Sequence, residues 1–145
     1  MKHKGSVPEI QGVDSQLYNK EYFKSIDGAQ YFSEDRTAPK FIYAIKISGL
    51  SQGDSALDIG CGRGDLMMAL AERGADVTGI DYSKDALEIA QKAIDKRPVE
   101  KKNKLKVLHS NATGLNFSDQ TFDYIFMTDI VEHLYPSELQ RCFKE

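Results

Sequence analysis

The chain has 145 residues, of which 41% are hydrophobic and 28% are charged, and these proportions are typical of a globular protein that folds as one domain. The net charge of −3 excludes a global attraction to nucleic acid, and no apolar run is long enough for a membrane span. The polar N-terminus lacks the apolar core of a signal peptide, so we expect a cytoplasmic protein.

The first fifty residues contain two short helix patterns. Residues 1–13 have no periodicity, and we expect a loose tail there. A short helix is expected from Asp14, a good N-cap, through a group rich in aromatic residues, Leu17, Tyr18, Tyr22 and Phe23. Residues 25–35 are expected to form a loop. A second helix is expected over 38–47, with Pro39 in its first turn and Gly49 at its end.

Residues 55–66 hold the most informative pattern. A short apolar strand leads into three alternating glycines, Gly60, Gly62 and Gly64, and apolar residues then recur at helical spacing from Leu66. This pattern predicts a strand, a tight turn and a helix N-terminus. Glycine suits such a turn because it tolerates positive φ and lets a ligand approach the main chain closely.

Two common nucleotide-binding loops do not fit this turn. A dinucleotide loop, G-x-G-x-x-G, requires its third glycine three residues after the second, where this chain has Asp65. A carboxylate there would repel a pyrophosphate, which disfavours a nucleotide-dependent oxidoreductase. A P-loop is excluded because no Gly-Lys-Ser/Thr follows.

Strand and helix patterns alternate through the rest of the chain. We expect strands at 55–59, 76–81, 105–109 and 122–128, and helices at 64–73 (closed by Gly74), at 84–95 and from Pro136. Such alternation predicts an α/β fold with a parallel sheet and helices on both faces. Right-handed crossovers place the first strand centrally, with the second and third on one side and the fourth on the other.

The glycine turn resembles the first motif of class I S-adenosylmethionine-dependent methyltransferases, strand-Asp-x-Gly-x-Gly-x-Gly, with Asp58 in the acidic position. Three further features are similar to that family: the strand ending in Asp81, the strand ending at Asn111, and the turn and strand from Asp119. The resemblance covers about residues 36–140, and within this family it is to the methyltransferases that act on small molecules. It implies a Rossmann-like fold and S-adenosylmethionine as the cofactor, with S-adenosylhomocysteine as the product.

The resemblance also implies a set of cofactor-binding residues. Asp81 would accept hydrogen bonds from both ribose hydroxyls, although a turn or helix-cap role explains it as well. Tyr82 would lie beside the adenine. Asn111 departs from the acidic residue usual in the family, but its amide oxygen can accept the same hydrogen bond from the adenine amino group. The full set is Asp58, Gly60, Cys61, Gly62, Gly64, Asp81, Tyr82, Asn111, Ala112, Thr128 and Tyr18.

Aromatic residues near the N-terminus are further candidates. In related enzymes an N-terminal helix covers the cofactor as a lid, which would bring Tyr18, Tyr22 or Tyr31 to the methionine end of the cofactor or to the substrate. Amphipathic packing explains the same residues without a functional role.

His133, just past the fourth strand, is the candidate general base, because an imidazole can take a proton near neutral pH. A packing or surface histidine is the alternative. Asp129, Glu132 and His133 also resemble the Glu-x-x-Glu-His run with which small-RNA 3′-terminal methyltransferases hold a divalent cation. That family requires further histidines downstream, and Cys61 and Cys142 show no metal-ligand spacing, so we expect no metal site.

Residues 92–106 carry seven lysines and arginines against only Asp95 and Glu100. This basic stretch is either a docking patch for an acidic partner or a solvated helix end and loop.

We divide the chain into a tail and lid-like helix (1–35) and an S-adenosylmethionine-binding Rossmann-like domain (36–145). The domain has about four strands, whereas the family has seven, so we expect an N-terminal portion of a longer domain, a covered edge or an unusual short form. In each case the fourth strand is an apolar sheet edge, so self-association through it is expected.

The leading hypothesis is methyl transfer from S-adenosylmethionine to a small-molecule acceptor by in-line displacement. The alternative is a non-catalytic module that binds S-adenosylmethionine or S-adenosylhomocysteine. Nucleic acid and membrane are not expected partners.

Overall fold

The computed structural model describes residues 15–26 and 28–145. The tail expected at 1–13 and the cap expected at Asp14 therefore lie outside the described residues. The strands are β1 (Ser55–Ile59), β2 (Asp76–Asp81), β3 (Leu105–His109) and β4 (Tyr124–Phe126). The helices are α1 (Lys20–Ser25), α2 (Ala29–Ser33), α3 (Pro39–Ser48), α4 (Asp65–Glu72), α5 (Lys84–Asp95), α6 (Val99–Lys102) and α7 (Pro136–Cys142), with 3-10 turns η1 (Ser15–Leu17) and η2 (Val131–His133).

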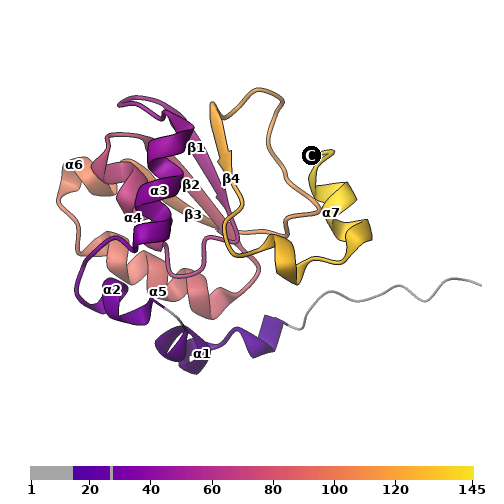
Figure 1. Cartoon of the computed structure of the whole chain (residues 1–145), viewed down its shortest axis with the longest axis horizontal. Coiled ribbons are helices and arrows are strands. Elements are labelled where there is room, and N and C mark those ends of the chain that lie inside the picture. Colours follow the sequence, from indigo (N-terminus) through magenta and orange to yellow (C-terminus); the bar gives the residue numbers. More distant parts are fainter. Residues whose placement is uncertain (1–14, 27) are drawn as a thin grey trace, which may run out of the picture.

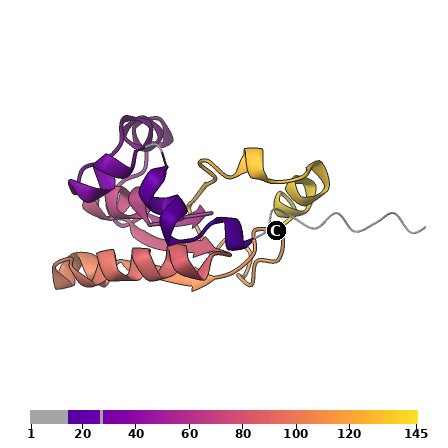
Figure 2. The same cartoon turned by 90° about the horizontal axis from the view of Figure 1, so that it is seen from below.

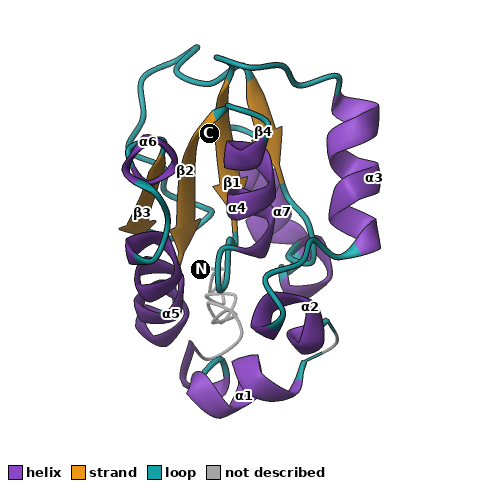
Figure 3. Ribbon diagram, turned by 90° about the vertical axis from the view of Figure 1, so that its left-hand side faces the viewer, coloured by secondary structure: helices purple, strands orange, loops and turns teal. Residues whose placement is uncertain are grey.

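The four strands form one parallel sheet in the order β3-β2-β1-β4 (Figure 1). This order confirms the prediction that the first strand is central, with the second and third on one side and the fourth on the other. The first three strands begin and end at the predicted residues. Their carboxyl ends meet at one edge of the sheet, and helices α1 and α2 lie beyond that edge (Figure 3).

Two apolar clusters fill the two faces of the sheet. The first packs α3, α4 and α5 against one face, and its buried members include Phe41, Leu70 and Ile94. The second lies on the other face, where the loop after β3 and helix α7 cover Leu57 and Ile59. Figure 3 shows α4 in front of the sheet and α7 behind it, and Figure 2 shows α7, in yellow, on the far side of the molecule from α6. The prediction of helices on both faces is therefore confirmed.

The N-terminal region differs from the prediction. The single helix expected from Asp14 is a short 3-10 turn followed by α1, because Asn19 interrupts it and caps α1 by accepting hydrogen bonds from the N–H groups of Glu21 and Tyr22. The loop expected at 25–35 contains helix α2, which Gly28 begins in a left-handed conformation. A five-residue helix is too short to produce the periodicity by which helices are recognised in a sequence.

Strand β4 is shorter than the strand expected over 122–128. Its partner β1 ends at Ile59, and the last residue of β4 that pairs with it is Phe126, opposite Asp58. Beyond this point the chain turns away, and Asp129 adopts a positive φ of 58°.

The basic stretch at 92–106 is largely neutralised within the molecule. Its cations pair with acidic side chains in Lys92–Glu88, Arg97–Asp35, Lys101–Glu72, Lys102–Asp95 and Lys104–Asp76. It also contains the short helix α6, which the sequence did not predict. These pairs favour a solvated helix end over a docking patch. None of the helices among the described residues has the length and apolar character needed to cross a bilayer.

Candidate functional site

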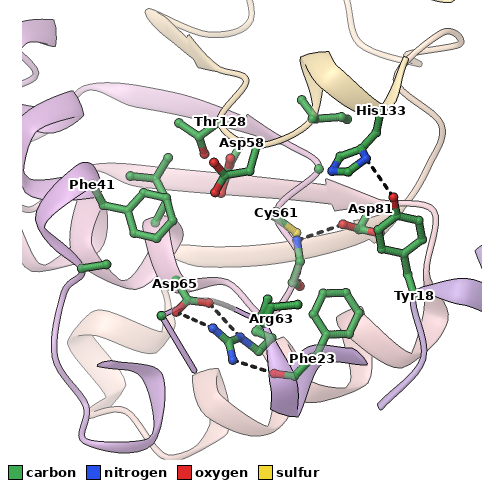
Figure 4. Close-up of a pocket in the computed structure, with 18 of the residues that line it drawn as sticks. Tyr18, Phe23, Phe41, Asp58, Cys61, Arg63, Asp65, Asp81, Thr128 and His133 are labelled. Atoms are coloured by element: carbon green, nitrogen blue, oxygen red, sulfur yellow. Dashed lines mark hydrogen bonds and ion pairs between the residues drawn. The ribbon is translucent and has the colours of Figure 1, made fainter. Parts of the chain in front are cut away.

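A cavity opens at the carboxyl ends of β1, β2 and β4, next to α1. Figure 4 shows residues that line it. The volume of the cavity that the centres of water molecules can occupy is about 140 Å³. A single water needs only about 10–15 Å³ on this measure, so the space is large enough for an organic ligand. Its lining includes the glycine turn, aromatic side chains from the N-terminal segment and several carboxylates. In open α/β sheets, ligands bind at this edge.

The glycine turn forms the floor of the cavity. The backbone N–H groups of Gly60 and Cys61 both donate to the carbonyl of Ile80, at 2.8 and 2.9 Å, which ties the turn to β2. Gly60 has a φ of 74°, and a Cβ at this position would lie only 2.8 Å from Cδ1 of Ile130. Only glycine therefore fits here, for both conformational and steric reasons. Gly64 ends the turn as the N-cap of α4.

Asp81, at the end of β2, connects three parts of the site. Its carboxylate accepts a hydrogen bond from the N–H of Gly62 at 2.9 Å and another from the N–H of Ser83 at 2.8 Å. Burial raises its pKa above the usual value, and the two backbone donors oppose that shift. A carboxylate has about four acceptor positions, so Asp81 keeps capacity for two hydroxyl donors of a ligand.

Asp58 is a buried carboxylate with an unused acceptor. Its side chain lines the cavity and is 1% exposed, and among the described residues its Oδ1 has no hydrogen-bond partner. Burial, with smaller contributions from the neighbouring carboxylates of Asp81, Asp65 and Asp129, raises its pKa to about 8. An unpaired buried carboxylate is costly unless a cation or donor meets it. Asp58 is protonated near neutral pH when no ligand is bound, and a cationic ligand would favour its ionised form, so the site suits a ligand that carries positive charge.

Tyr18 closes one side of the cavity (Figure 4). Its hydroxyl lies 3.1 Å from Nδ1 of His133, and the two side chains share a hydrogen bond between the N-terminal segment and the 3-10 turn η2. The ring of Tyr82 lies 5.6 Å from that of Tyr18, and the rings of Tyr18 and Tyr22 are 4.8 Å apart. The cavity thus has an aromatic wall suited to a flat ring.

Two cations near the cavity did not stand out in the sequence. Arg63 is buried and forms an ion pair with Asp65, and Lys40 of α3 forms one with Asp129. The position of Arg63, directly after Gly62, is a signal that could have identified it. Lys40 carries no such signal, because only the fold brings α3 to the loop after β4.

The structure brings most of the predicted cofactor-binding residues together. Around the cavity lie Tyr18, Asp58, Gly60, Cys61, Gly62, Asp81, Tyr82, Thr128 and the candidate base His133. Three others lie outside its lining. Gly64 caps α4, Ala112 belongs to the second apolar cluster, and the Asn111 amide oxygen accepts hydrogen bonds from the N–H and hydroxyl of Thr113. Of the N-terminal tyrosines, Tyr22 lines the cavity, whereas Tyr31 packs against the first apolar cluster.

The described residues include no group of three or more His, Cys, Asp or Glu side chains arranged to hold a metal ion. Asp129, one of the three residues considered for such a site, is paired with Lys40.

Comparison with known proteins adds three findings. The sequence profile of a family described as "Methyltransferase domain" matches residues 56–145. The demethylmenaquinone methyltransferase of Geobacillus sp. (strain WCH70) is 34% identical over 84 residues, which are 56% of this chain and 35% of that protein. An S-adenosylmethionine-dependent methyltransferase from Methanosarcina mazei superposes with a TM-score of 0.62 at 34% identity, over 70% of this chain and 50% of that one.

The fold is also similar to that of a glycopeptide N-methyltransferase, MtfA, solved with sinefungin. The TM-score is 0.65 at 15% identity, over 73% of this chain and 42% of that one, and at this identity the likeness concerns the fold alone. The chain spans at most half the length of each of these three proteins.

Proposed function

Because this chain belongs to the methyltransferase-domain family of class I S-adenosylmethionine-dependent enzymes, we propose that it binds S-adenosylmethionine in the cavity above the glycine turn and transfers its methyl group to a small-molecule acceptor. The observation that carries this proposal is the pair of carboxylates at the carboxyl ends of β1 and β2. Asp81 has acceptor capacity left for hydroxyl donors, and Asp58 has a buried oxygen that lacks a hydrogen-bond partner in the described part of the chain.

These residues match the chemical groups of the cofactor. Asp81 would accept hydrogen bonds from the ribose hydroxyls, and the aromatic wall at Tyr82 would lie against the adenine. Asp58 would meet the positively charged methionine end, where an ionised carboxylate gains a partner that it lacks among the described residues. The absence of side chains at Gly60 and Gly62, which both line the cavity, would let the ligand approach the backbone of the turn.

When bound, S-adenosylmethionine supplies a methyl group on a sulfonium, which is an excellent leaving group for in-line displacement. The residues of this chain therefore have to position the acceptor and exclude water rather than to activate the donor. Tyr18, Tyr22 and Phe23 lie over the cavity and would exclude water from it.

His133 is the proposed general base, for an acceptor atom that carries a proton. If its Nδ1–H donates to the hydroxyl oxygen of Tyr18, Nε2 is left unprotonated and able to take that proton. Tyr18 would then hold the imidazole in the useful tautomer and orientation.

The acceptor is proposed at the level of a small molecule. Demethylmenaquinone is the compound in the names of the curated relatives, so it is the first acceptor to test. The alternative is a module that binds the cofactor without catalysis. A binding measurement combined with a methyl-transfer assay separates the two.

The proposal is tested by titrating the protein with S-adenosylhomocysteine in a calorimeter and by assaying transfer of a radiolabelled methyl group to a panel of small molecules. We expect micromolar binding and transfer to at least one acceptor. Binding without transfer to any acceptor favours the non-catalytic module. No binding at millimolar ligand by a folded protein overturns both.

The role of His133 has its own test once an acceptor is found. We expect His133→Asn to lower kcat by about 100-fold to 10,000-fold, the usual contribution of a general base, while the affinity for S-adenosylhomocysteine changes little. An unchanged kcat would show that positioning alone drives the reaction.

A further inference from the structure

Arg63 connects the glycine turn, which forms the floor of the cavity, to helices α1 and α2, which form its roof. It follows Gly62 in the turn, and its side chain is only 6% exposed. Nη1 donates a hydrogen bond to the carbonyl of Phe23 at 2.7 Å (Figure 4). The guanidinium carbon lies 4.8 Å from the centre of the Phe32 ring. One side chain of the turn thus contacts both α1 and α2.

Asp65 holds this guanidinium in place. Its two carboxylate oxygens accept hydrogen bonds from Nε and Nη2 of Arg63, at 3.1 and 3.2 Å. Such a two-point pairing fixes the plane of the guanidinium, which leaves Nη1 directed at Phe23. The pair is shielded from solvent, so salt screens it far less than a surface pair.

The other charged contacts of the N-terminal segment are more exposed. Lys20 and Glu88, which join α1 to α5, have side chains that are 47% and 45% exposed. Asp35, which pairs with Arg97, is 68% exposed. Surface pairs of this kind contribute little to stability. Near the start of the segment, the Ser83 hydroxyl also donates to the carbonyl of Tyr18 at 2.6 Å. At its middle, the buried contact is Arg63.

Helix α1 forms part of the roof of the cavity. Phe23 lines the cavity, and its ring lies 3.5 Å from the position that a Cβ on Gly62 would occupy. Helix α1 therefore packs directly on the turn and bounds the cavity on this side, so movement of α1 away from the turn would widen the route by which a ligand leaves.

We propose that Arg63 is a positioning residue that holds α1 closed over the cavity and so slows release of the adenosyl ligand. The proposal rests on the proposed function, because the ligand is the one assigned there. It concerns the order of α1 and the lifetime of the complex.

The first measurement is hydrogen–deuterium exchange of the protein without ligand. In Arg63→Met, which keeps bulk but removes all donors, we expect the amides of α1 to exchange at least about 10-fold faster than in the wild type, while the amides of β1 and β2 keep their protection. Arg63→Lys should fall between the two, because an ammonium can reach one acceptor but lacks the fork. The matched control is Arg73→Met, an exposed arginine at the C-terminal end of α4.

The second measurement is the dissociation rate of S-adenosylhomocysteine by surface plasmon resonance. We expect faster release by about 10-fold in Arg63→Met, with an association rate within about threefold of the wild type, and wild-type rates in Arg73→Met. Unchanged exchange in α1 together with unchanged release would overturn the proposal, because Arg63 would then only fill space.

Two outcomes are kept apart by this design. If the wild-type protein binds no ligand, the proposed function fails, while the exchange of α1 amides still decides whether Arg63 holds the roof. If Arg63→Met does not fold, Arg63→Lys replaces it, since it keeps the positive charge but loses the two-point pairing with Asp65 that directs a donor at Phe23. Faster exchange of α1 and α2 amides then supports the proposal, and wild-type exchange overturns it.

Discussion

The carboxylate of Asp81, at the end of β2, accepts a hydrogen bond from the backbone N–H of Gly62 at 2.9 Å. The turn after β1 is thus held by a side chain from the neighbouring strand. The same carboxylate faces the cavity, so one residue both shapes the turn and offers acceptors to a ligand.

Replacing Asp81 by Ala is expected to weaken binding of S-adenosylhomocysteine by about 1.5–3 kcal/mol, which is the usual contribution of hydrogen bonds to a charged group. This loss corresponds to roughly 10-fold to 150-fold in Kd and can be measured by calorimetric titration. The matched control is Asp76→Ala at the opposite, solvent-exposed end of β2, where affinity should be unchanged. Equal affinities for the two variants would show that Asp81 is only a turn residue.

Gly60→Ala is expected to destabilise the protein more than Gly53→Ala. Both glycines have a positive φ, of 74° and 93°, so each substitution carries a backbone strain of about 1 kcal/mol or more. A Cβ on Gly53 would meet no atom of residues 15–26 or 28–145 within 4 Å, whereas a Cβ on Gly60 would lie 2.8 Å from Cδ1 and 3.1 Å from Cβ of Ile130. We therefore expect Gly60→Ala to lower the free energy of unfolding, measured in urea, by ~1–3 kcal/mol more than Gly53→Ala does.

Ile130→Val isolates the steric part of this effect, because it removes Cδ1. In the Gly60→Ala background this substitution should recover part of the lost stability, whereas alone it should destabilise the protein slightly. Purely additive effects would show that Gly60 is required for its backbone conformation alone.

The bounds of the first three strands and the order of the sheet were predictable from the sequence. The apolar strands at 55–59, 76–81 and 105–109 are bounded by turn residues, and right-handed crossovers leave one arrangement for them. The floor of the site was predictable for the same reason, since the glycine turn and Asp81 follow directly from those strands.

The roof of the site was not predictable in the same way. Helices α1 and α2 have six and five residues, too few for a clear period, and contacts distant in sequence hold them in place. Arg63 reaches the carbonyl of Phe23, 40 residues away, and no local pattern marks a backbone acceptor. The Asn111 amide oxygen accepts hydrogen bonds from Thr113, as short polar side chains in turns commonly do, and its contact with adenine stays a prediction.

Asp58 gives the stability of the protein a specific dependence on pH. The pKa of this carboxyl is raised from 3.8 to about 8 by burial, so between these values the folded protein holds a proton that the unfolded chain releases. The contribution of Asp58 to the free energy of unfolding is therefore largest below about pH 4, falls as the pH rises, and is constant above about pH 8. The loss is at most about 1.4 kcal/mol for each pH unit.

Asp58→Asn removes this titration. The free energy of unfolding of both proteins is measured in urea at several pH values. The difference between the variant and the wild type should change in favour of the variant as the pH rises from 5 to 8. The exposed Asp76 provides the control, because Asp76→Asn removes a carboxylate whose side chain is 58% exposed. A difference between Asp58→Asn and the wild type that stays constant across this range would show that Asp58 is ionised throughout.

Strand β4 forms one edge of the sheet and carries Ile125, which is 59% exposed. An apolar edge strand with unpaired backbone groups favours pairing with another chain, so we expect this protein to self-associate at high concentration. Ile125→Lys should reduce this association, because a charge on the edge opposes strand addition. Size-exclusion chromatography with light scattering, over a range of protein concentrations, gives the mass of each variant. As a control, Val99→Lys places the same charge on α6, away from β4, and should leave the association unchanged. A wild-type protein that remains monomeric at every concentration would contradict the prediction.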